Sequence, residues 1–147
     1  MSFKRLLLEA LKAGIAGAFV MPIAGMISKP IFSWHVWQYG KKSAEIFVEN
    51  PSFGLLFAVH LLWSWVAALL LIAFLRKMRA DSPVLLGAAV GGIYYFLVNA
   101  IALPLYFGDP FPWQQGVPYL AQPLIVLVSF AICVSFMSRR YVLSRES

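Results

Sequence analysis

The fold is most clearly predicted by residues 84–123, VLLGAAVGGIYYFLVNAIALPLYFGDPFPWQQGVPYLAQP. This stretch opens with an apolar segment, Val84 to Tyr106, that begins with small residues and carries one amide, Asn99. A Pro- and Trp-rich loop follows, and a second apolar segment begins after it. Because an apolar run of about 20 residues can cross a bilayer as a helix, this stretch predicts two membrane helices joined by a tight connection.

The composition of the whole chain favours a membrane protein. Of its 147 residues, 61% are hydrophobic and 12% are charged, whereas a soluble domain has about 25% charged residues. The net charge of +6 is carried by short basic clusters between long apolar runs. That distribution is typical of polytopic membrane proteins. We therefore expect the lipid bilayer as a partner and no nucleic acid, and the length predicts one domain.

Two further apolar segments complete a four-span protein. The spans are predicted at about residues 6–28, 53–75, 84–106 and 118–137. Asp81-Ser82-Pro83 predicts the start of the third span, since a capping residue followed by Pro is a helix-start signature. The connection between the first two spans has helical character from Lys42 to Glu49, which predicts a short helix at the membrane surface. The predicted fold class is all-α: one domain, residues 1–147, whose four transmembrane helices form an antiparallel bundle.

The basic residues orient these spans. Nine of the twelve Lys and Arg residues fall at one end of the predicted bundle, and Lys29, Lys41 and Lys42 fall at the other. Cytoplasmic segments carry the excess of Lys and Arg in polytopic proteins, so both termini are predicted to be cytoplasmic. The opposite end is predicted to carry an aromatic belt, which consists of Trp34, Trp37, Tyr39, Tyr106, Trp113 and Tyr119.

Small residues predict where the helices touch. Gly14 and Ala18 in the first span, and Gly87 and Gly91 in the third, are each four residues apart. Residues at this spacing lie on one face of a helix. Small side chains let two backbones approach closely in a membrane, so we expect these four residues at helix contacts.

Four polar side chains, His60, Ser64, Asn99 and Gln122, are predicted to share the outer leaflet. At the rise of an α-helix, His60 and Asn99 lie about 10 Å from the outer ends of their spans, and Gln122 about 6 Å. The simplest interpretation is interhelical hydrogen bonding, with each bond contributing roughly 0.6–2 kcal/mol. In that interpretation the His60 imidazole bridges Asn99 and Ser64. The alternative is a small polar pocket for a ligand, a proton or a lipid headgroup.

Other chemistries lack the groups they need, so neither an enzyme nor a resident metal or cofactor is expected. Haem b requires two His at one depth on facing helices, and the second His, His35, lies in the outer connection. Haem or quinone therefore enters only as an alternative. A proton-coupled exporter requires a carboxylate deep in the membrane, whereas Glu9 lies near the cytoplasmic end. The single Cys133 has no partner for an internal disulfide or a Cys-x-x-Cys pair.

A family resemblance rests on four features of the second half. They are the small-residue helix start from Gly87 to Gly92, the polar Asn99, the Leu103-Pro104-Leu105 turn and the Asp109-x-x-Pro112-Trp113 loop. Together with the helix that contains His60, they resemble the YagU family of small bacterial inner-membrane proteins over about residues 53–140. Family members can carry His where this chain has Asn99 and, near the start of the last helix, Gln122-Pro123. The resemblance implies the fold and a bacterial inner membrane, and it implies no molecular activity.

Two classes of function are compatible with these residues. The first is a non-catalytic accessory, assembly or small structural subunit of a larger membrane complex, partnered by other integral membrane subunits or by itself. A chain with few catalytic groups and almost no soluble part suits that role. The alternative is a membrane protein that binds a small molecule, a proton or a redox cofactor (haem or quinone) around His60.

Overall fold

The computed structural model describes residues 3–32 and 37–144, and these residues form helices and turns without any strand. In chain order, the helices are α1 (Phe3–Phe32), α2 (Trp37–Glu45), α3 (Phe53–Lys77), α4 (Pro83–Tyr94), the π-helix η1 (Tyr95–Ala102), α5 (Leu103–Phe107), α6 (Pro112–Gln115) and α7 (Val117–Leu143). Four stretches are long and apolar enough to cross a membrane, namely Phe3–Ile31, Phe53–Lys77, Pro83–Phe107 and Val117–Leu143. The predicted all-α fold with four spans is confirmed, and the protein is a multi-pass membrane protein.

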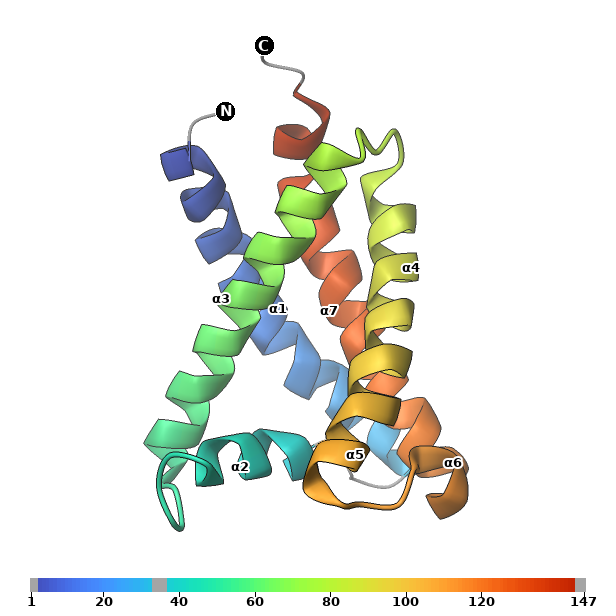
Figure 1. The fold of residues 1–147 in the computed structure, drawn as a ribbon. Helices are drawn as coiled ribbons and strands as arrows, with labels where there is room; N and C mark the ends of the chain where they lie inside the picture. The colour runs from blue at the N-terminus through green and yellow to red at the C-terminus, as the bar shows by residue number, and fades with distance from the viewer. Residues whose placement is uncertain (1–2, 33–36, 145–147) are drawn as a thin grey trace.

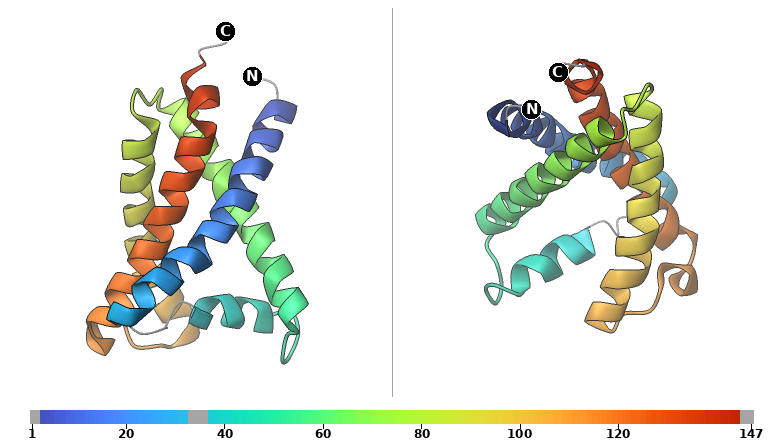
Figure 2. Two further views of the ribbon diagram at one scale, coloured as in Figure 1. Left: turned by 180° about the vertical axis from the view of Figure 1, so that it is seen from behind. Right: turned by 45° about the horizontal axis from the view of Figure 1, so that its top comes forward.

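Helix α7 is the centre of the arrangement. It packs against α1 and α4, and α1 packs in addition against α3. Both chain ends lie beside the α3–α4 turn at one end of the molecule, which we call the termini end (Figure 1). Helices α2, α5 and α6 lie at the opposite end, which we call the α2 end. Helices α3 and α4 approach each other at the termini end and separate toward the α2 end (Figures 1 and 2).

The buried core is concentrated toward the termini end. Small side chains supply much of it, because alanines let neighbouring helices pack at short distances. Its members are Leu6, Ala10, Ala13, Ala68, Leu71, Ile72, Leu75, Ala80, Phe130, Ala131, Val134, Tyr141 and Val142. They come from both ends of the chain and from the second half of α3, so this half of the molecule holds the four long helices together.

The small residues singled out in the sequence lie at close helix contacts. A Cβ atom added to Gly14 would lie 2.9 Å from the Cα atom of Trp65 on α3. One added to Gly91 would lie 2.7 Å from the Cβ atom of Ala131 on α7, and Gly87 packs against Ser135 one turn further along α7. Ala18 is 2% exposed. These contacts bring the α1 backbone close to α3, and the α4 backbone close to α7.

Two spans are longer than predicted. Helix α1 covers Phe3–Phe32 and includes Pro22 and Pro30. Helix α7 continues past the expected stop at Ser138-Arg139-Arg140 and ends at Leu143. Tyr141 and Val142 belong to the buried core, and their burial stabilises the additional turn. Basic residues near a helix C-terminus also interact favourably with the helix dipole, so they do not end it.

The third span is interrupted by a π-helix that the sequence analysis did not predict. The Leu103-Pro104-Leu105 segment was expected to close the span, but the helix continues through it to Phe107. Pro104 has no N–H, and in a regular α-helix its ring clashes with the carbonyl four residues earlier, here that of Ala100. The π-helix η1, which is wider than an α-helix, ends at Ala102, two residues before Pro104. At this end Leu103 N donates to Val98 O, five residues back.

The surface helix is present but shifted along the chain. It covers Trp37–Glu45 instead of Lys42 to Glu49. Ser52 then caps α3, because its side chain accepts a hydrogen bond from Leu55 N at 3.3 Å. Residues 33–36, which include Trp34 and His35 of the predicted aromatic connection, lie outside the described residues.

Candidate functional site

His60 binds the backbone of α1, and neither Ser64 nor Asn99 is its partner. Its Nε2 atom lies 2.9 Å from the carbonyl oxygen of Ala18. Since a carbonyl oxygen can only accept, Nε2 carries the proton and donates. The predicted bridge between Asn99 and Ser64 is therefore wrong. The bond instead ties the middle of α1 to the first half of α3.

The reason why Ala18 O accepts a side chain lies four residues further along α1. In an α-helix this carbonyl would receive the N–H of residue 22. That residue is Pro22, which has no N–H. A buried acceptor without a donor costs about 1–3 kcal/mol. His60 supplies the donor that Pro22 cannot, so its primary contact is structural.

Gln122 makes a separate contact between α7 and α1. Its side chain is fully buried, and Nε2 lies 3.3 Å from both Gly25 O and Ser28 Oγ. Ser28 Oγ in turn donates to Gly25 O at 3.1 Å. Gln122 therefore fixes α7 to α1 near the α2 end and is not among the residues that line the cavity described next.

A large cavity separates α3 from α4 and η1. Its volume is about 850 Å³. One wall is the face of α3 from Leu56 to Phe74, and the opposite wall runs from Val90 on α4 to Phe107 on α5. Helix α7 forms the back between Tyr119 and Ala131. At 1.5 Å per residue, the α3 wall is about 27 Å long, which is nearly the thickness of a bilayer core.

Three of the four predicted polar residues, His60, Ser64 and Asn99, line this cavity. Ser64 is 2% exposed, and its hydroxyl makes no hydrogen bond within the part of the chain that the structure describes. Asn99 lies in η1 on the opposite wall and makes no hydrogen bond to the described residues either. The structure therefore places the Asn99 carboxamide within reach of a molecule in the cavity, whereas the Ser64 hydroxyl is too deeply buried for that.

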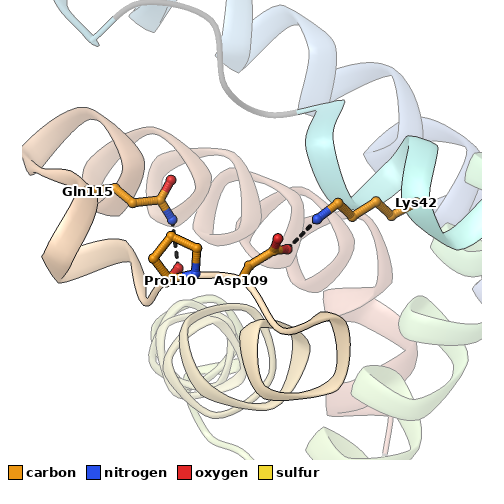
Figure 3. A network of polar contacts seen from close by, with 4 residues as sticks. All are labelled: Lys42, Asp109, Pro110 and Gln115. Carbon is orange, nitrogen blue, oxygen red and sulfur yellow. Dashed lines mark hydrogen bonds and ion pairs between the residues drawn. The ribbon is translucent and has the colours of Figure 1, made fainter.

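An ion pair joins α2 to the loop that follows α5, at the α2 end of the molecule. Lys42 on α2 donates to Asp109, which follows α5, and the two side chains point toward each other across the gap (Figure 3). The Lys42 ammonium also lies 5.4 Å from the centre of the Phe107 ring. In the same loop, Gln115 Nε2 donates to Pro110 O at 2.7 Å. Helix α2 is thereby held across the opening between α3 and α5.

Charged and metal-ligating side chains are scarce around the cavity. No Lys, Arg, Asp, Glu or Cys is among the described residues that line it. Among residues 3–32 and 37–144, no three His, Cys, Asp or Glu side chains gather closely enough to hold a metal ion. His35, the second His considered for haem, lies outside the described residues.

Sequence reasoning missed the cavity and the Lys42–Asp109 pair. Nothing in the local pattern predicts that α3 and α4 separate, or that two charges 67 residues apart meet. A usable signal did exist for His60. A Pro inside a span predicts an orphaned carbonyl four residues earlier, and a His in another span is a natural donor for it.

We predict that the stabilising effect of His60 depends on Pro22. His60→Leu should lower the free energy of unfolding by about 1–3 kcal/mol, because Ala18 O loses its donor. In a Pro22→Ala background, the restored backbone N–H can bond Ala18 O. The loss of unfolding free energy caused by His60→Leu should then be smaller by about 1 kcal/mol, which is in the usual range of coupling energies for contacting residues. Denaturation of the four proteins in detergent measures this coupling. His60→Gln, which keeps a donor, is the control, and equal costs in both backgrounds would contradict the assignment.

Comparison of this chain with family models, with curated proteins and with solved structures finds no match. The resemblance to the YagU family therefore stays a prediction. What the protein does is inferred below from the geometry of the cavity itself.

Proposed function

We propose that this protein binds an amphipathic molecule, taken from the membrane, in the cavity between α3 and α4. The observation that carries the proposal is the cavity itself. Its volume of about 850 Å³ falls in the range of roughly 300–1,000 Å³ found for small-molecule sites. Because the two helices that flank it separate toward the α2 end (Figure 1), a membrane-soluble molecule can enter sideways from the bilayer.

Two features of the cavity walls support binding over simple loose packing. Asn99 lines the cavity and makes no hydrogen bond to the described residues, so its carboxamide is available to a polar group of the ligand. Asn99 also lies in the π-helix η1, and π-helical turns occur frequently at functional sites. Since no carboxylate, amine, guanidinium or thiol is found among the described residues that line the cavity, the proposed role is binding without catalysis.

A non-catalytic accessory role in a larger membrane complex is the second candidate. In this role, a transmembrane helix of a partner subunit or of a second copy packs against the α3 side of the same cavity. Trp63 and Leu70, which line the cavity on α3, are 54% and 65% exposed. Such side chains provide apolar contact area for another helix as well as for lipid.

Filling the cavity should abolish ligand binding. We predict that protein purified from its own membranes in mild detergent carries a co-purifying small molecule, detectable by native mass spectrometry. Val98→Trp places a large side chain into the cavity and should remove that mass. The matched control is Leu97→Trp, because Leu97 lies next to it on η1 but is 60% exposed and does not line the cavity. Circular dichroism would check that both variants remain folded.

The other outcomes of this experiment separate the two candidates. Loss of a stoichiometric protein partner from Val98→Trp, with no small molecule in the wild type, would favour the accessory role. Equal small-molecule content in wild type, Val98→Trp and Leu97→Trp would place binding elsewhere and contradict the proposal.

We further propose that the protein resides in a bacterial inner membrane with both termini in the cytoplasm. The positive-inside rule supports this orientation, because eight of the eleven Lys and Arg residues in the described part of the chain fall at the termini end. In a Cys133→Ala background, single cysteines at positions 40 and 114 should react with an impermeant maleimide from outside intact cells. A cysteine at position 79 should react only after permeabilisation. The reverse labelling pattern would contradict the orientation.

A further inference from the structure

Resting on the proposed binding site, we infer the class of its ligand: an amphiphile with an uncharged, hydrogen-bonding head and a long apolar chain. The head lies in the half of the cavity nearer the α2 end, beside Asn99. The chain runs from there toward the termini end. This assignment follows from how polarity is distributed along the cavity walls.

The polar side chains of the cavity are concentrated in the half nearer the α2 end. In this half, at the level of Ser64 and Asn99 or closer to the α2 end, lie Ser43, His60, Ser64, Asn99, Tyr106, Gln115 and Tyr119. Tyr94 is the exception, since it lies nearer the termini end. Beyond this level, the α3 wall is Ala67, Leu70, Leu71 and Phe74, and α7 adds Leu127, Phe130 and Ala131. The cavity therefore has one polar half and one apolar half, and a matching ligand has a polar head and an apolar chain.

The η1 wall offers hydrogen bonds within this polar half. Asn99 lines the cavity and makes no hydrogen bond to the described residues. Its carboxamide both donates and accepts. A ligand head that also donates and accepts, such as a glycerol, satisfies this group.

The described residues that line the cavity include no charged side chain, which argues against an ionic head. An ion moved from water into such surroundings must be paired, because an isolated charge there is costly. At the α2 end, Lys42 and Asp109 bind each other. An anionic head would have to displace Asp109 from Lys42, and a cationic head would have to displace Lys42.

The apolar half sets the length of the chain that is held. From Ser64 to Phe74 the α3 wall extends for ten residues, or about 15 Å. Burying apolar surface there contributes affinity in proportion to its area. A longer chain extends sideways between α3 and α4 into the bilayer, so chain length is selected only weakly and the head decides specificity.

Ligands that share one chain and differ in the head test this inference. The probes are 1-oleoylglycerol, oleate, oleylamine and the headless 1-octadecene, each titrated into delipidated protein and followed by native mass spectrometry. We expect 1-oleoylglycerol to bind at least about tenfold more tightly than oleate or oleylamine. Asn99→Leu should weaken binding of 1-oleoylglycerol about three- to tenfold, which corresponds to one lost hydrogen bond. It should leave 1-octadecene unaffected, which also shows that the variant is folded.

The control variant is Ala102→Leu, which adds a side chain to η1 at an exposed position that does not line the cavity. It should bind all four probes as the wild type does. Equal binding of the three probes with heads, or tighter binding of oleate or oleylamine, would overturn the inference about the head while leaving the proposed binding function intact. Failure of every probe to bind, 1-octadecene included, would count against the proposed function itself.

Discussion

One backbone carbonyl without a helical donor fixes how the first half of this protein is built. Pro22 removes the N–H that Ala18 O would accept, and His60 on α3 replaces it at 2.9 Å. Four residues earlier on α1, Gly14 lets the α3 backbone come close at Trp65. The hydrogen bond and the close contact together determine where α3 crosses α1. Because the first half of α3 packs against α1, it lies away from α4 (Figure 1).

The cavity is a consequence of that crossing. Toward the termini end, α1, α3 and α7 meet in a core of alanines and branched aliphatic side chains, and Gly87 and Gly91 hold α4 against α7. Toward the α2 end no comparable contact joins α3 to α4, and α2 extends across the gap with Lys42 bound to Asp109. Tight packing in one half and separation in the other leave an elongated space between α3 and α4.

Much of the fold could be predicted from the sequence, because long apolar segments and their flanking charges determine four spans almost alone. The small residues were also predicted at helix contacts from spacing. The cavity could not be predicted, since it depends on crossing geometry that no local pattern encodes. His60 was identified as a polar group inside a span, and it is half-buried in the structure. Its partner was missed because the missing N–H belongs to Pro22, in another helix. The π-helix was missed because Pro104 suggested an end to the span, whereas the helix widened ahead of it.

In a bilayer, α3 and α4 are expected to lie apart near α2. Double electron–electron resonance in lipid nanodiscs measures this directly, with spin labels at Ala58 and Leu105 near the α2 end and at Lys77 and Leu85 near the termini end, in a Cys133→Ala background. The distance between the first pair of labels should exceed that between the second pair by about one helix diameter, roughly 10 Å. Similar distances for both pairs would mean that α3 and α4 pack along their length at the usual separation of about 8–10 Å between helix axes. Such packing would leave no cavity between the two helices and would rule out the proposed binding site.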